Sequence, residues 1–197
     1  RGARPVLWSV VEKTALADAE VEYEDHTSPS IYVRFPVVTP ADPALDGAAI
    51  VIWTTTPWTI PGNRAIAVGA GLDYVRLTVR AVDEKSRVRV GDELVMSEVL
   101  RQTACTEMGI EEHEVTAQFK GSAVTGTVCA HPLHDKGFDH DVPVFEADFV
   151  TTEQGTGFVH IAPSHGEDDF HLGREHGLPV PDMVDEAGCY FEHVPLF

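Results

Sequence analysis

Two prolines and two tryptophans that follow a buried strand constrain this chain more than any other stretch. The apolar run Ala48–Ile52 predicts a buried strand, and residues 53–63 continue it as Trp-Thr-Thr-Thr-Pro-Trp-Thr-Ile-Pro-Gly-Asn. Pro57 and Pro61 fix the backbone, so we expect neither strand nor helix to continue there. The result is a stiff loop at a strand end. Its hydroxyl groups come from Thr54, Thr55, Thr56 and Thr59, and its apolar walls are the indole rings of Trp53 and Trp58. Threonine runs are also common in edge strands, so this stretch alone leaves a binding role and a structural role equally open.

A second stretch, residues 154–177, reads QGTGFVHIAPSHGEDDFHLGREHG. Gly155 and Gly157 permit a close backbone approach before a short strand, Phe158–Ile161, which places His160 near the strand's end. Ser164 and Glu167 have the spacing of a capping box, which predicts a helix that begins there and ends at Gly177.

The first turn of that helix contains Asp168 and Asp169, where the helix dipole favours ionised carboxylates. This strand–turn–helix unit therefore directs an imidazole, from His160, and a fixed anion toward one cleft.

Together, Trp53–Asn63 and Gly155–Asp169 resemble the editing domain, an inserted connective peptide, of isoleucyl-tRNA synthetase, a class I enzyme. The opening Pro5–Val37 resembles the segment by which that insertion leaves the catalytic body. The sister valyl and leucyl enzymes carry an Arg-Pro pair after their threonines, whereas this chain has Thr56-Pro57-Trp58-Thr59. The HIGH and KMSKS signatures of the catalytic body are absent, and the first residue is Arg1 rather than Met. The chain is thus expected to be an excised editing domain.

The resemblance implies a hydrolase that cleaves valine from mischarged tRNA(Ile), and it assigns roles to individual residues. Asp169 would bind the free ammonium of the aminoacyl ester, a charge-assisted bond worth about 1.5–3 kcal/mol. Asn63 would bond the ribose or the carbonyl, and His160 would line the amino-acid pocket. The four threonines Thr54, Thr55, Thr56 and Thr59 would orient water and ester.

The expected specificity of that pocket is steric. One methylene separates isoleucine from valine and is worth about 1–3 kcal/mol, a discrimination for which the isoleucyl enzyme is the standard example. A second, smaller pocket would admit valine and reject isoleucine at an overpacking cost of about 1–3 kcal/mol or more. The expected walls are Thr56, Trp58 and His160, with Trp53 as a further substrate-binding residue.

The length of 197 residues and 43% hydrophobic content predict one globular domain. We expect a connector over residues 1–30, an editing core over 31–183 and a return connector over 184–197. Many short strands with two modest helices predict an α+β fold, a mixed β-barrel-like domain with short peripheral helices. The expected elements include strands Ile31–Val38 (with Pro36 at an edge or bulge), Ala65–Val68, Tyr74–Arg80, Glu114–Lys120, Thr125–Ala130 and Val144–Val150, a hairpin of Arg87–Val90 with Glu93–Met96, and a helix capped by Ser97 that runs through Met108.

The net charge of −18 argues against tight binding of free tRNA, because Asp and Glu outnumber Lys and Arg by 32 to 14. We expect the parent body to hold most of the tRNA, while this domain receives its 3′ end. The scattered Cys105, Cys129 and Cys189 indicate a reducing compartment, here the cytoplasm. No apolar run reaches membrane-span length, and a monomer is expected.

Two alternative functions remain open. A module that binds an amino acid or adenosine without chemistry would explain why no strong general base other than histidine is evident. A metal-dependent hydrolase would use the histidines, but they lack zinc-site spacing, so we expect neither metal nor cofactor in this domain. The histidines in question are His131, His134, His165, His171 and His176.

Overall fold

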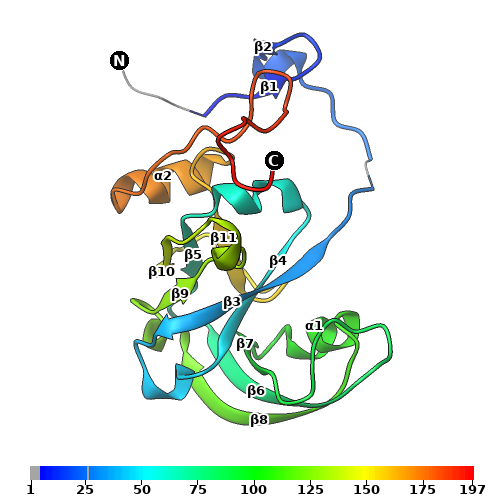
Figure 1. The fold of residues 1–197 in the computed structure, drawn as a ribbon, viewed down its shortest axis with the longest axis vertical. Helices are drawn as coiled ribbons and strands as arrows, with labels where there is room; N and C mark the ends of the chain where they lie inside the picture. The colour runs from blue at the N-terminus through cyan, green and yellow to red at the C-terminus, as the bar shows by residue number, and fades with distance from the viewer. Residues whose placement is uncertain (1–4, 26) are drawn as a thin grey trace.

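The computed structural model describes residues 5–25 and 27–197 (Figure 1). The expected connector 1–30 therefore includes positions, residues 1–4 and 26, that lie outside the described residues. The strands are β1 (Trp8–Ser9), β2 (Thr14–Ala15), β3 (Ile31–Thr39), β4 (Ala49–Thr54), β5 (Ala65–Val68), β6 (Asp73–Val82), β7 (Glu93–Ser97), β8 (Ile110–Lys120), β9 (Val128–Ala130), β10 (Asp141–Glu146) and β11 (Phe158–Ile161). The α-helices are α1 (Arg101–Glu107) and α2 (Glu167–Glu175), and the 3-10 helices are η1 (Asp18–Glu20), η2 (Pro43–Leu45), η3 (Pro57–Gly62), η4 (Gly121–Ala123) and η5 (His134–Lys136).

One mixed sheet of nine strands organises the fold, in the order β11-β5-β10-β9-β3-β4-β7-β6-β8. The β5–β10 and β4–β7 pairs are parallel, and the other pairs are antiparallel. The α+β class is confirmed. The sheet curls so that β11 also lies against β4 (Figure 1). No ladder among the described residues joins β11 to β8, so barrel closure stays a prediction.

Strand β4 is apolar from Ala49 to Trp53 because both of its faces are buried. Ile50 and Ile52 belong to one hydrophobic core, while Ala49 and Val51 belong to a second core under α1. Successive side chains of a strand point to opposite faces, so a strand between two cores needs a continuous apolar run. The expected strand over residues 48–52 is thus confirmed, and β4 ends at Thr54, whose side chain is buried.

Several expected boundaries are wrong. Ser97 ends β7 and its N–H donates to Thr156 O at 2.7 Å, so α1 begins only at Arg101 and uses Leu100 as its N-cap. Residues 87–90 form no strand, because the segment turns through several side-chain-capped bends instead of pairing with β7. Strand β3 is not an edge strand, since it lies between β4 and β9. Its β9 ladder starts only at Val37, past Pro36, and shows the expected bulge.

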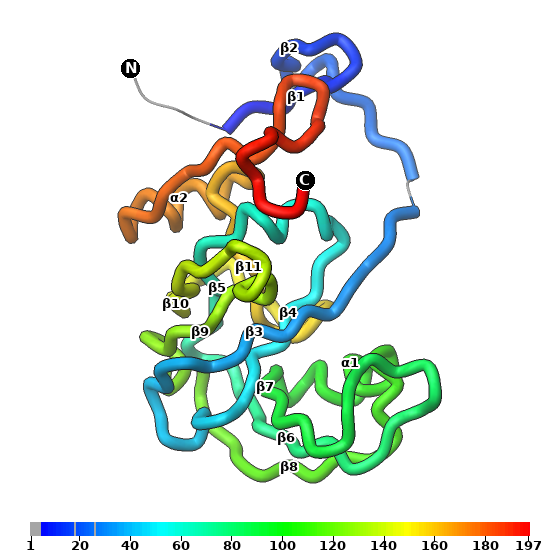
Figure 2. Tube along the Cα trace, viewed as in Figure 1, coloured from blue at the N-terminus to red at the C-terminus, as the bar shows by residue number. Residues whose placement is uncertain are grey.

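The N-terminal hairpin and the C-terminal segment lie together in the upper part of the molecule (Figure 2). The β1–β2 hairpin packs against the C-terminal segment, where Trp8 Nε1 donates to Glu186 O at 3.0 Å. Among the described residues, every helix is too short or too polar to cross a lipid bilayer.

Candidate functional site

Helix η3 replaces the loop that the prolines predicted after β4. Pro57 occupies its first turn, where no N–H is needed. Pro61 cannot donate to the carbonyl of Trp58, and that oxygen instead accepts from Tyr190 Oη at 2.6 Å. A side chain from the C-terminal segment therefore satisfies the backbone group that Pro61 leaves open, which is why a 3-10 helix survives two prolines.

The threonines hold the entry to η3 through backbone contacts. Thr56 N–H donates to Thr54 Oγ1 at 3.0 Å, and Thr59 Oγ1 donates to Thr56 O at 2.9 Å. Thr54 and Thr59 are buried, whereas Thr55 is exposed. Thr54 and Thr59 thus fix the backbone, and Thr55 is the freest hydroxyl of the set.

His160 joins the two stretches that the sequence singled out. Its Nε2 lies 2.9 Å from Thr59 Oγ1, and its Nδ1 lies 3.4 Å from Asn63 Nδ2. An amide nitrogen only donates, so Nδ1 accepts and Nε2–H donates to Thr59. Burial, followed by the neighbouring His165, lowers the pKa of His160 to about 4. The imidazole is therefore neutral at pH 7, with both nitrogens engaged.

Asp169 turns back over the start of α2 instead of standing free. Its Oδ1 accepts from Ala162 N–H at 2.6 Å, and a Cβ on Gly166 would lie 2.4 Å from Oδ2. Burial raises the pKa of Asp169, and its backbone hydrogen bonds oppose that shift. The expected capping box is wrong: Gly166 is the N-cap, and Ser164 Oγ donates to Pro181 O. The helix end at Gly177, with φ of +66°, and the acidic first turn match the expectation.

A hollow of about 260 Å³ lies between the end of β4, the β10–β11 loop and β11. Five residues of its lining, Phe149, Thr151, Phe158, Val159 and Gln154, were not among the expected site residues. Gln154 and Phe158 belong to the motif stretch, but Phe149 and Thr151 carry no sequence signal. The expected residues that line it are Trp53, Thr54, Thr55 and His160, together with Gly155 and Gly157.

The other expected residues lie outside this lining. Thr59 and Asn63 are buried and contact His160. Thr56, at the start of η3, and Asp169, in the first turn of α2, are partly buried. Trp58 is 51% exposed, and its ring packs edge-on against His165 with centroids 4.9 Å apart. The structure thus brings Thr59, Asn63 and His160 together but does not place Trp58 in the wall of the hollow.

Two buried polar atoms of residues 53–63 have no hydrogen-bond partner within the described part of the chain. They are Asn63 Oδ1 and Trp53 Nε1. Such atoms are costly unless water or a ligand satisfies them. Asn63 Nδ2 donates to Ala65 O at 2.9 Å, so its amide orientation is fixed and Oδ1 remains an acceptor beside the imidazole.

The glycine loop, which contains Gly155 and Gly157 and lies beside the hollow, is held in place by Tyr74 of β6. Tyr74 Oη donates to Gly157 O at 2.5 Å, and burial raises the pKa of Tyr74 to about 12. A Cβ on Gly157 would lie 2.6 Å from Ser97 Cβ, and the residue has a φ of +76°. Only glycine meets both demands, which explains the close approach that the sequence predicts.

The remaining histidines near η3 hold carbonyl groups. His131 Nε2 donates to Ile60 O and His140 Nε2 lies against Asn63 O, both at 2.9 Å. Burial, the largest cause, lowers the pKa of His131 to about 4. Across residues 5–25 and 27–197 no three His, Cys, Asp or Glu side chains cluster as metal ligands do.

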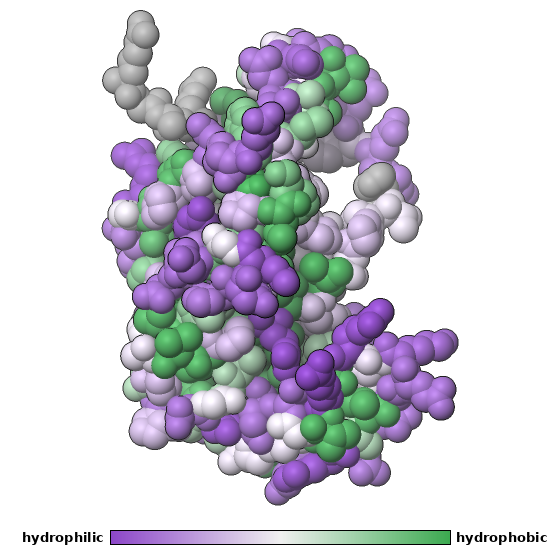
Figure 3. Space-filling model, in the orientation of Figure 1, coloured by the Kyte–Doolittle hydropathy of each residue, from purple (hydrophilic) through white to green (hydrophobic). Residues whose placement is uncertain are grey.

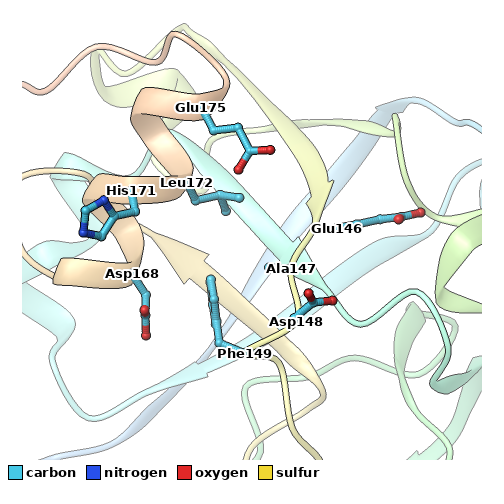
Figure 4. A pocket seen from close by; sticks show the side chains of 8 residues that line it. All are labelled: Glu146, Ala147, Asp148, Phe149, Asp168, His171, Leu172 and Glu175. Atoms are coloured by element: carbon cyan, nitrogen blue, oxygen red, sulfur yellow. The ribbon is translucent and has the colours of Figure 1, made fainter.

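A second hollow, of about 290 Å³, lies between α2 and the end of β10 (Figure 4). Its carboxylates are Asp168 and Glu175 from α2, Glu146 at the end of β10, and Asp148 just after it. Phe149 lines both hollows. Asp168 therefore belongs to a different depression from His160.

Comparison with known proteins agrees with this geometry. Residues 46–193 match the family model for the editing domain of leucyl-tRNA synthetase. The chain is 51% identical over 197 residues to an isoleucine–tRNA ligase of Gluconobacter oxydans, covering 99% of this chain and 20% of the relative, and 47% identical to that of Pelagibacter ubique, covering 100% and 21%. It spans about a fifth of the length of these relatives.

Solved structures show the same fold at low identity. The crystal structure of GlLeuRS-CP1 matches with a TM-score of 0.57 and 16% identity, over 77% of this chain and 66% of that one. The P. falciparum cytosolic leucyl-tRNA synthetase editing domain matches with a TM-score of 0.51 and 15% identity, over 66% and 47%. The chain therefore belongs to the family of aminoacyl-tRNA synthetase editing domains described by the leucyl-tRNA synthetase model.

Proposed function

We propose that this domain hydrolyses the ester that joins valine to the terminal ribose of tRNA(Ile), as the editing domain of an isoleucyl-tRNA synthetase. The observation that carries the proposal is the 2.9 Å contact between Thr59 Oγ1 and His160 Nε2. It joins the threonine stretch to the β11 strand beside one hollow, where substrate could meet both.

The chemistry proceeds by positioning rather than by a strong base. His160 is neutral and both its nitrogens are engaged, so it orients Thr59 and Asn63 and shapes the pocket. Thr55 is exposed and available to hold a water or a ribose hydroxyl, while Asn63 Oδ1 is a buried acceptor without a protein partner among the described residues, which a single water can satisfy. Preorganised donors and acceptors of this kind lower the barrier without changing protonation.

Asp169 anchors the substrate's ammonium through Oδ2, since Ala162 N–H engages Oδ1. His160 is the wall that makes the chamber too small for isoleucine, while Thr56 and Trp58, which were also expected as walls, lie outside the lining. The curled, barrel-like sheet brings β11 against β4, so that His160 and the end of β4 line one depression. The domain acts as a monomeric insertion, without metal or cofactor, in a cytoplasmic synthetase whose body supplies most tRNA contacts.

The decisive experiment compares Asp169→Asn with Asp168→Asn in deacylation of valyl-tRNA(Ile). We expect Asp169→Asn to lower kcat/KM by about 10- to 100-fold, the equivalent of one charge-assisted bond. Asp168→Asn removes a neighbouring exposed carboxylate that lines the other hollow, and should retain the wild-type rate. Equal rates for all three proteins would contradict the anchor.

The size filter is tested at His160. Replacing His160 by Ala enlarges the chamber and should begin to release isoleucine from isoleucyl-tRNA(Ile), while His160→Gln keeps most of the volume and the rejection. Undiminished discrimination by His160→Ala would rule out its role as a wall.

A binding module without chemistry is the second candidate, and the absence of a free imidazole nitrogen at His160 favours it. It predicts a calorimetric signal for a valyl-adenosine mimic with no deacylation. Turnover in the same preparation decides for the hydrolase.

A further inference from the structure

Residues 85–89 present three exposed cations in a chain of net charge −18: Lys85, Arg87 and Arg89. They alternate with Ser86 and Val88, which point inward. Ser86 Oγ donates to Met108 O at 2.6 Å, and Val88 packs on the core beneath α1. Lys85, Arg87 and Arg89 are exposed whereas Ser86 and Val88 are partly buried, so this loop presents its three cations to solvent.

The loop is ordered by two of its own acidic residues, Asp83 and Asp92. Asp83 Oδ1 accepts from the N–H groups of Lys85 and Ser86, at 2.8 and 2.7 Å. Asp92 accepts from Arg89 N–H and forms an ion pair with Arg34 at 2.8 Å. Since Asp92 is paired with Arg34, the three cations face two carboxylates, Asp83 and Glu84, and residues 83–89 keep a net charge of +1.

Most other cations of the described chain are already engaged. Six form ion pairs: Arg34, Arg76, Arg80, Arg101, Lys120 and Lys136. Arg64 donates to the carbonyl groups of Pro61 and Asn63, and Arg174 lies over the ring of Phe170. Lys13 stands alone on the β1–β2 hairpin. Within the described residues, the loop is therefore the place where unpaired cations gather.

Strand β6 relates this loop to the hollow. Its first buried residue, Tyr74, bonds the glycine loop at Gly157 O, and its last residue, Val82, directly precedes the loop. Eight steps at about 3.3 Å per residue separate them by at most about 26 Å. That length equals about eight nucleotides of a stacked strand at about 3.4 Å each. The lobe that carries α1 and β8 presents a largely hydrophilic surface on the face seen in Figure 3.

We propose that Lys85, Arg87 and Arg89 form a docking surface for the phosphate backbone of the RNA whose 3′ end enters the hollow. The inference rests on the proposed function, which supplies a strand of RNA that must continue outward from the site. Phosphate contacts position a nucleic acid without reading its sequence, and three flexible cations are suited to contacts of this kind. An otherwise acidic surface repels the same backbone, so this loop selects the approach.

The test is the salt dependence of kcat/KM for deacylation of valyl-tRNA(Ile) by this chain and by Lys85→Gln/Arg87→Gln/Arg89→Gln. Each lost phosphate contact reduces the slope of log kcat/KM against log salt by about 0.7–0.9. The triple variant should lose about 2–3 units of slope. The hydrolysis of a valyl-adenosine ester, which is too short to reach the loop, should stay at the wild-type rate.

Arg80→Gln/Lys120→Gln/Lys136→Gln is the matched control, because it removes the same charge from cations held in ion pairs. Its slope should stay within about 0.5 of wild type, less than one phosphate contact. An unchanged slope in the loop variant, or an equal loss in the control, overturns the docking surface. If the triple loop variant does not fold, the single variant Arg87→Gln should still reduce the slope of log kcat/KM against log salt by about 0.7–0.9.

The failure of this inference is distinguishable from failure of the proposed function. Hydrolysis of the short ester with no effect of the loop on tRNA leaves the hydrolase and removes the docking surface. If neither substrate is cleaved, salt-dependent binding of uncharged tRNA(Ile), followed by fluorescence anisotropy, tests the loop by the same slopes.

Discussion

At the scale of single residues, the site depends on imidazoles kept neutral by burial. His131 and His160 each have a pKa lowered to about 4, and each uses a ring N–H to hold a neighbouring group. A charged imidazole at either position would lie among other histidines and Arg64 without a compensating carboxylate contact. Neutral rings therefore act as rigid hydrogen-bonding spacers, His160 fixing η3 to β11 and His131 fixing η3 to the segment after β9.

This state has a consequence for stability that can be measured. The pKa of His131 is about 4 in the folded chain and about 6.5 when unfolded, so below pH 6.5 the unfolded state binds the extra proton. The stability from this residue is complete above pH 6.5 and declines as pH falls toward 4. His131→Gln retains a donor for Ile60 O. Between pH 7 and 5 its free energy of unfolding should fall by less than that of the wild type, the difference reaching about 2 kcal/mol.

Urea unfolding at the two pH values measures the difference. His134→Gln is the control, because His134 is exposed and should follow wild type. If His131→Gln and wild type lose equal stability over this range, His131 is not held neutral by the fold.

The sequence predicts much of this site but not its internal contacts. It places His160 at the end of a strand and Asp169 in the first turn of a helix, and both placements are confirmed. It does not reveal that Asp169 folds back onto Ala162 N–H, because that contact depends on the turn at Gly166. Nor does it single out Phe149 and Thr151, whose part in the hollow arises only from the path of the β10–β11 loop.

At the scale of elements, the fold is most predictable where the local pattern and the tertiary contacts agree. The expected strands Ala65–Val68 and Phe158–Ile161 match β5 and β11 to the residue. Ser97 is a good helix cap by type, but its N–H is taken by Thr156 O, so tertiary pairing overrides local propensity. Similarly, η3 depends on Tyr190, which is 132 residues away from Trp58.

The contact between η4 and the turn before β6 gives a second prediction. A Cβ on Gly121 would lie 2.1 Å from Gly69 O, which is backbone and cannot rotate away. Gly121→Ala should therefore destabilise the chain by about 1–3 kcal/mol or more. Gly71→Ala, in the same turn but with open space around its Cβ, should stay within about 0.5 kcal/mol of wild type.

Urea denaturation of the two variants checks this contrast. Because both changes add one methyl group, they share any general effect of replacing glycine on the unfolded chain. Equal stabilities would mean that η4 shifts away from Gly69 at little cost.

At the scale of the whole molecule, the excess of carboxylates opposes the compact folded state as well as the binding of RNA. Each of the six ion pairs has at least one partly exposed partner, and such surface pairs contribute little. The net charge of −18 concentrates like charges on one small surface. Repulsion should therefore outweigh ion pairing in the balance of surface electrostatics.

This balance predicts that salt stabilises the chain. Raising NaCl from 20 to 300 mM shortens the Debye length from about 20 Å to below about 8 Å and screens the repulsion, so Tm should rise. KCl at equal concentration should have the same effect, since the mechanism is screening rather than ion binding. Glu111→Gln/Glu112→Gln removes two exposed carboxylates next to Glu114 and should raise Tm at low salt, with a shallower salt dependence. A Tm that falls as the NaCl concentration rises would show that attraction within the ion pairs outweighs repulsion among the surface carboxylates.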